Sequence, residues 1–231
     1  MGRVQVFDVN ETLLDLAAMD PHFQRIFGDA GVRVAWFTQM ISSALVGTVT
    51  GAYDRFGAHA MAALEMTAEQ AGVKLAGEDK EAVAAQLRQL PPHPEVADAL
   101  RRLGDAGLRL AALTNSTEEV ATAQLEHAGL IDRFELVLSA DTVRRLKPAP
   151  EPYRMAAERL GVAVGGVRLI AAHAWDVAGA ARAGCATAFV GRPGKVLDPL
   201  VERPEIVGAD LAEVADAILA AEGLTTAPGP A

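Results

Sequence analysis

The sequence has little cysteine, no excess of positive charge and no long apolar run. Its 231 residues include a single cysteine, Cys185, which excludes an internal disulfide framework and favours a reducing compartment. The 30 acidic residues outnumber the 21 Lys and Arg, for a net charge of −9, whereas a phosphate-binding surface needs clustered basic residues. No apolar run approaches the ~18 residues of a membrane span. We therefore expect a cytoplasmic protein that binds neither nucleic acid nor a membrane.

What the sequence does contain is typical of a folded α/β protein. Hydrophobic residues make up 51% and charged residues 22%, whereas a disordered chain combines low hydrophobicity with high charge. Five short apolar runs indicate buried strands, at residues 4–9, 108–113, 134–138, 167–172 and 187–190. Amphipathic helical patterns lie between them, at residues 118–128, 150–160 and 176–183. This alternation predicts a parallel sheet with helices on both faces.

One long segment interrupts the alternation. Residues 15–93 read as helices separated by loops, at 21–27, 34–46, 58–71 and 80–90. The stretch Pro91-Pro92-His93-Pro94 cannot lie within a helix and is predicted to lead back to the sheet. We predict a core of residues 1–14 and 94–222, a helical insertion of residues 15–93 and a disordered tail of residues 223–231. An insertion directly after the first strand is well placed to cover a site.

Polar residues gather where the predicted strands end. In an open α/β sheet, ligands bind at the carboxyl ends of the strands. A carboxylate beside an ammonium stays ionised and can act as a nucleophile, and a second carboxylate can hold that ammonium or activate water. Each residue alone also fits a helix cap or a turn, so the inference depends on their convergence. The residues concerned are Asp8, Asn10, Thr12, Thr114, Asn115, Lys147, His173 and Asp176.

Four motifs in this order carry a family resemblance. They are Phe7-Asp8-Val9-Asn10-Glu11-Thr12-Leu13, Leu113-Thr114-Asn115-Ser116, Lys147-Pro148-Ala149-Pro150-Glu151-Pro152-Tyr153 and Ala174-Trp175-Asp176 with Gly179-Ala180. The set resembles the haloacid dehalogenase superfamily and, within it, the type II (L-2-haloacid) dehalogenases. The similarity runs from residue 7 to about residue 196, with the same spacing throughout.

The resemblance implies a fold and a reaction. The fold would be a doubly wound, Rossmann-like core with a helical cap inserted after the first strand. The reaction would be hydrolytic removal of halide from a short 2-haloalkanoic acid through an aspartyl ester, with no cofactor and no metal. The expected partner is that small-molecule 2-haloacid, and a homodimer is one possible assembly.

The resemblance also implies residue roles. Asp8 would be the nucleophile and Thr12 would orient it. Lys147 would hold Asp8 ionised, and Asp176 would hold Lys147 or help to activate water. Thr114 and Asn115 would bind the substrate carboxylate or the departing halide. We further assign four residues to substrate or halide binding: Asn10, Phe37, Tyr153 and Trp175.

The chain departs from the dehalogenase pattern at several positions. The first motif usually reads Asp-x-Tyr-Gly-Thr, but Asn10 and Glu11 stand in the place of Tyr and Gly. The cap usually supplies an arginine for halide or carboxylate, and Phe37 aligns with it. The last motif usually reads Ser-x-Asn-Ala-Trp-Asp, but Ala171 and His173 replace Ser and Asn. His173 could donate to halide or carboxylate or assist water, because its charge is adjustable near neutral pH. A strand-end histidine bound to a backbone carbonyl is the plainer interpretation.

Most of the superfamily transfers phosphoryl groups, so a phosphatase is the first alternative. Such a phosphatase usually has an acid two residues after the nucleophile, where this chain has Asn10, whose amide cannot supply a proton in that way. It also has an acid four residues before the final Asp, where this chain has Ala172. Mg²⁺ prefers octahedral oxygen coordination and gains little from so sparse a site. These losses favour dehalogenation; a hydrolase with altered substrate and a weakly active small-carboxylate binder remain as further alternatives.

Overall fold

The computed structural model describes residues 2–224 and contains a six-stranded parallel sheet in the order β3-β2-β1-β4-β5-β6. Its strands are β1 (Val4–Phe7), β2 (Leu110–Thr114), β3 (Leu136–Ser139), β4 (Val167–Ala171), β5 (Ala186–Val190) and β6 (Ile206–Gly208). The chain builds outward from β1 in one direction and then returns to add β4 on its other side. The strand order therefore reverses between β1 and β4, where open α/β sheets bind their ligands.

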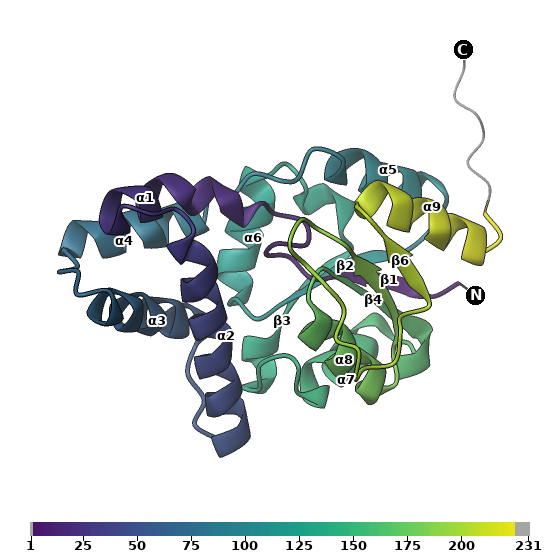
Figure 1. Cartoon of the computed structure of the whole chain (residues 1–231). Helices are drawn as coiled ribbons and strands as arrows, with labels where there is room; N and C mark the ends of the chain where they lie inside the picture. Colours follow the sequence, from purple (N-terminus) through teal and green to yellow (C-terminus); the bar gives the residue numbers. More distant parts are fainter. Residues whose placement is uncertain (1, 225–231) are drawn as a thin grey trace, which may run out of the picture.

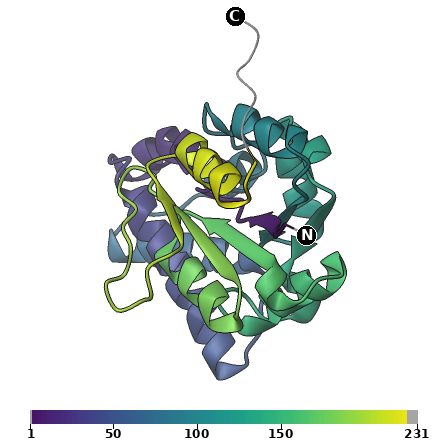
Figure 2. The same ribbon diagram turned by 90° about the vertical axis from the view of Figure 1, so that its right-hand side faces the viewer.

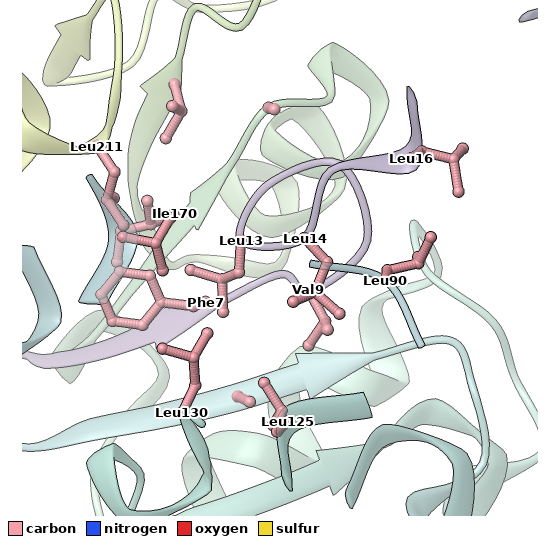
Figure 3. Packing of buried hydrophobic residues seen from close by; sticks show 14 of the residues in the cluster. Phe7, Val9, Leu13, Leu14, Leu16, Leu90, Leu125, Leu130, Ile170 and Leu211 are labelled. Carbon is pink, nitrogen blue, oxygen red and sulfur yellow. The ribbon is translucent and has the colours of Figure 1, made fainter. Parts of the chain in front are cut away.

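Helices cover both faces of the sheet, as Figure 1 and Figure 2 show. On one face lie α5 (Val96–Asp105), α6 (Glu118–His127) and α9 (Leu211–Ala221), and on the other lie α7 (Pro150–Leu160) and α8 (Ala174–Ala183). Alternate strand residues point to opposite faces, so neighbouring residues of β1 join different cores. Phe7 packs with Leu125, Leu130 and Ile170 in the first core (Figure 3), whereas Val6 belongs to the second.

Four helices lie between β1 and α5, at one end of the molecule (Figure 1). They are α1 (Asp20–Phe27), α2 (Val32–Thr50), α3 (Phe56–Gln70) and α4 (Gly77–Leu87), preceded by a 3₁₀ turn, Leu16–Met19. The indole of buried Trp36 donates to the Ala60 carbonyl at 2.9 Å and so ties α2 to α3. Where the chain enters and leaves this group, Leu14 bridges Pro92. We propose residues 15–93 as the cap and residues 1–14 and 94–222 as the core.

The structure has elements that the sequence analysis did not predict. Strand β6 and helix α5 are additional, and α2 extends beyond its predicted 34–46. Of the tail that we expected to be disordered, residues 223 and 224 are ordered: the amide of Leu224 donates to the Leu219 carbonyl at 2.8 Å, just beyond α9. Residues 225–231 lie outside the described residues. Within residues 2–224, no helix is long and apolar enough to cross a membrane.

Candidate active site

Lys147 joins two carboxylates at the carboxyl end of the sheet. Its Nζ lies 2.9 Å from Asp8 Oδ1, just after β1, and 2.6 Å from Asp176 Oδ2, in the first turn of α8. A third hydrogen bond goes to the Leu113 carbonyl of β2 at 2.9 Å. These contacts use all three N–H groups of the ammonium, which is buried. Burial alone would lower the pKa of Lys147, but the charges of Asp176 and Asp8 raise it, so the lysine is charged.

The loop that carries Lys147 is held by motif residues. The Lys147 amide donates to Asn115 Oδ1 at 2.7 Å, and Asn115 Nδ2 donates to the Lys147 carbonyl at 3.3 Å. On the other side, α8 packs directly on Pro148. A Cβ at Gly179 would lie 2.4 Å from the Cβ of Pro148, so only glycine fits there. Asn115 and Gly179 thus determine where the lysine stands.

The second oxygen of Asp8 receives two further donors. Thr12 Oγ1 lies 2.7 Å from Asp8 Oδ2 and also accepts from the Ala172 amide at 2.9 Å, which directs the hydroxyl hydrogen to Asp8. His173 Nδ1 lies 3.2 Å from the same oxygen. Burial raises the pKa of Asp8, but Lys147 and His173 outweigh it and hold this pKa well below its usual range. The carboxylate is therefore ionised at neutral pH, as a nucleophile must be.

His173 is an ion-paired residue rather than a neutral strand-end histidine. Its Nε2 lies 2.8 Å from Glu11 Oε2, opposite the contact of Nδ1 with Asp8. Burial lowers its pKa, but hydrogen bonds to Asp8 and Glu11 and their negative charges raise it to about 9. The ring lies between Phe37 and Trp175, with centroids 5.6 and 5.0 Å away. Since both ring N–H groups have carboxylate partners, the geometry leaves neither for a halide, contrary to one expectation from the sequence.

Glu11 is a site residue that the sequence analysis did not select. Its φ of 61° is left-handed, a conformation that costs a non-glycine residue roughly 1–2 kcal/mol, and it stands where the family pattern has glycine. Besides His173, its carboxylate contacts Lys195 Nζ at 2.6 Å and Arg33 Nη1 at 3.9 Å. Burial raises the pKa of Glu11, but His173 and Lys195 lower it overall. The mismatch between glutamate and a glycine position was the only sequence signal for it.

A small cavity lies beside Asp8. Its volume of about 10 Å³ corresponds to roughly one water molecule. It is lined by Asp8, Asn10, Phe37, Ile41, Phe56, Thr114, Asn115, His173 and Trp175. Most residues that we assigned to substrate or halide therefore come together here. Asn10 Oδ1 accepts from Gln124 at 3.1 Å, and Thr114 Oγ1 accepts from the Ser116 amide at 3.1 Å.

Tyr153 does not line this cavity, although the sequence analysis placed it with the substrate. It lies on α7, is buried, and donates from its hydroxyl to Asp176 Oδ1 at 2.5 Å. Burial and the neighbouring Asp176 raise its pKa well above the usual value, so it remains a donor. Both oxygens of Asp176 thus have partners, and burial raises the pKa of this carboxyl although Lys147 opposes the change. The phenol supports the lysine network from behind.

The donor set does not suit a magnesium ion. The Lys147 ammonium lies between Asp8 and Asp176, the two carboxylates that would have to bind the metal. Within residues 2–224, no three His, Cys, Asp or Glu side chains are grouped to hold a metal ion. All four oxygens of these carboxylates already have protein donors, which leaves few ligands for the near-octahedral oxygen coordination of Mg²⁺.

Comparisons with known proteins agree with this geometry. A family model described as haloacid dehalogenase-like hydrolase matches residues 3–184. The (S)-2-haloacid dehalogenase of Pseudomonas sp. (strain YL) is 28% identical, and the match covers 86% of this chain and 87% of that protein. Haloacetate dehalogenase H-2 of Moraxella sp. (strain B) is 29% identical, and the match covers 86% of this chain and 90% of that protein. The L-2-haloacid dehalogenase of Xanthobacter autotrophicus with covalently bound chloropropionic acid superposes with a TM-score of 0.88 at 25% identity, covering 97% of this chain and 100% of that one. The chain therefore belongs to the haloacid dehalogenase-like hydrolase family.

Proposed function

We propose that this protein is a 2-haloacid dehalogenase that hydrolyses the carbon–halogen bond of a 2-haloalkanoic acid without a cofactor. The observation that carries the proposal is the Asp8 carboxylate, held ionised by Lys147, Thr12 and His173 in the wall of a small cavity. The similarity to proteins named for this activity supports it. We also infer a cytoplasmic location, because the single cysteine, Cys185, has no partner for an internal disulfide.

In the first step, a carboxylate oxygen of Asp8 attacks C2 of the substrate. The new C2–O bond forms as the carbon–halogen bond breaks, and the halide leaves with the bonding electron pair. The walls of the cavity offer donors for the halide and for the substrate carboxylate in the Asn115 amide, the Asn10 amide and the Trp175 indole. Phe37 supplies an apolar wall that excludes water from the nucleophile.

In the second step, water attacks the carbonyl carbon of the Asp8 ester. Lys147, 2.9 Å from one oxygen of this group, stabilises the negative charge that develops on it. Because the ester is neutral, one of the two charges that raise the pKa of His173 is gone, and His173 releases its proton to solvent. The neutral imidazole then takes a proton from the attacking water. The bond from the carbonyl carbon to the substrate oxygen then breaks, and that oxygen takes the proton from His173 as the 2-hydroxy acid leaves. The second proton of the water, left on the new Asp8 carboxyl, passes to His173, which restores the Asp8 carboxylate and the charged imidazole. Asp176, with both oxygens engaged, holds Lys147 in place.

Halide release tests the proposal against its alternatives. We expect halide from chloroacetate or 2-chloropropionate, at a rate that EDTA leaves unchanged. Hydrolysis of p-nitrophenyl phosphate that requires Mg²⁺, with no halide release, would support a phosphatase instead. A melting shift with chloroacetate but no turnover of either compound would leave a small-carboxylate binder.

A further inference from the structure

A second, larger cavity adjoins the one beside Asp8. Its volume is about 300 Å³, whereas that of the first cavity is about 10 Å³. The larger volume reaches the lower end of the range of small-molecule sites, roughly 300–1,000 Å³. The two cavities share Asn10, Phe37 and Phe56 in their walls. The larger one lies between the proposed cap and the start of α6. Its apolar wall consists of Leu16, Met40, Phe56, Ala60, Leu87 and Val120.

Asn10 leaves part of this space open. It stands where the dehalogenase pattern has tyrosine, a far larger side chain, and it borders both cavities. Gln124 fixes its amide by donating to Oδ1 at 3.1 Å, and donates also to the Leu87 carbonyl at 2.5 Å. The other amide atom of Gln124, Oε1, is buried and has no hydrogen-bond partner in the described part of the chain. A buried acceptor left unpaired is costly, so a water or a donor on a bound molecule is expected at this wall.

An anionic substrate has a route to Asp8 other than the apolar cavity. A third cavity, also of about 300 Å³, borders His173 and Trp175 and is lined by Thr38, Ser42 and Lys195. The Lys195 ammonium, which also pairs with Glu11 at 2.6 Å, places positive charge beside this cavity and suits the approach of an anionic substrate, whereas the Thr38 and Ser42 hydroxyls donate to carbonyls of their own helix. The apolar cavity is therefore the better position for the group attached to C2.

We propose that the apolar cavity is a subsite for the 2-substituent, so that preferred substrates are 2-haloacids with an aliphatic or aromatic group of several carbons. This inference rests on the proposed dehalogenase function. Burial of each methylene is expected to raise kcat/KM about fourfold, as long as the chain fits. A substituent of four to six carbons would thus outweigh the methyl of 2-chloropropionate by more than about tenfold.

The test compares 2-chloropropionate with 2-chlorohexanoate and 2-chlorooctanoate on two matched variants. Val120→Phe fills the apolar cavity from α6, and Thr38→Phe adds the same ring beside the third cavity from α2. In the unaltered protein, kcat/KM should rise by at least about tenfold from the propionate to the longer acids. Val120→Phe should abolish most of that ratio, and Thr38→Phe should preserve it. A ratio near one in the unaltered protein, or equal effects of the two variants, would overturn the subsite.

A binding measurement separates this inference from the proposed function. Calorimetry with 2-hydroxyoctanoate and lactate needs no turnover, so it decides the subsite even if no acid releases halide. Tighter binding of the longer acid that Val120→Phe removes would support the subsite. If an acid with a second carboxylate at its far end bound more tightly than 2-hydroxyoctanoate, exposed Arg55 at the rim would be the group recognised. That result would contradict an apolar substituent.

Discussion

The two oxygens of Asp8 face two different kinds of surroundings. On the Oδ1 side, Lys147 with Asp176 comes from motifs that this chain shares with its family, and every N–H of the ammonium is bonded in a buried setting. On the Oδ2 side, His173 with Glu11 comes from two positions where the chain departs from the pattern. A positive charge lies on each side of Asp8, but only the cation on the Oδ1 side, Lys147, belongs to a motif that the chain shares with its family.

The positive charge on the Oδ2 side comes from His173 of the core and not from the helices between β1 and α5. The cap arginine of the pattern is Phe37 here, and Phe37 stacks on His173, which carries the new charge. Besides Asp8, Glu11 is a second buried anion beside His173, at 2.8 Å, and helps to keep it protonated. The two departures, Glu11 and His173, are thus complementary parts of one arrangement.

Removing the cation on the shared side should have the largest effect. Lys147→Met leaves Asp8 and Asp176 buried without a counterion, so we expect unfolding free energy to fall by about 3–5 kcal/mol and halide release to be lost. Denaturant unfolding and halide assays measure both. Lys80→Met is the matched control, because both members of its ion pair with Glu65 are exposed and its loss should cost about 1 kcal/mol or less. Equal effects of the two substitutions would contradict the asymmetry.

Thr12 lies on the Oδ2 side of Asp8, and Thr12→Val should have the next largest effect. The valine removes the donor to Asp8 and leaves the buried Ala172 amide without its acceptor, at a cost of about 1–3 kcal/mol. Activity should fall together with stability, and Thr12→Ser, which keeps the hydroxyl, should restore most of both. No rescue by serine would show that the threonine methyl matters more than its hydroxyl.

Gly179→Ala tests how the shared side is positioned. The new Cβ collides with Pro148, so we expect a loss of about 1–3 kcal/mol and a displaced Lys147 with reduced kcat. Gly104→Ala in α5 is a suitable control, because nothing lies within 4 Å of its Cβ and the helix should gain about 0.5–1 kcal/mol. Thermal melting of both variants provides the comparison, and a neutral Gly179→Ala would refute the close packing.

The smallest effect is a shift in pH dependence on the other side. His173 has a pKa of about 9, above its usual 6.5, so its stabilising contribution is complete below about 6.5 and is lost as pH rises through about 9. The melting temperature should fall over the same alkaline range. Glu11→Gln removes one of the two anions and should move that fall to lower pH, whereas exposed Glu69→Gln should not. If Glu11→Gln left the alkaline fall at the same pH, Glu11 would have no part in keeping His173 protonated.

Local sequence patterns were enough to predict most of the fold. Five strands follow from runs of apolar residues, because strands of a parallel sheet are buried on both faces. Strand β6 is only Ile206–Gly208, too short for such a run. Helix α5 had a usable signal in Val96, Ala99, Leu100 and Leu103, whose spacing marks one buried face.

The site was harder to predict because its contacts join distant residues. Asp8 and Lys147 were brought together correctly by reasoning about strand ends. The placement of Tyr153 behind Asp176, and not in the cavity, depends on how α7 packs on α8. Glu11 and His173 are 162 positions apart in the sequence, so no local sequence pattern predicts that they pair.

The most direct test of the central claim follows the oxygen of Asp8. A single turnover of 2-chloropropionate with excess enzyme in H₂¹⁸O, followed by mass spectrometry of the peptide that contains Asp8 and of the product, locates the label. If Asp8 is the nucleophile, ¹⁸O enters its carboxylate and the first 2-hydroxy acid carries ¹⁶O. Asp8→Asn should release no halide. Label in the first product with none in Asp8 would mean that water attacks C2 directly, and would contradict the account.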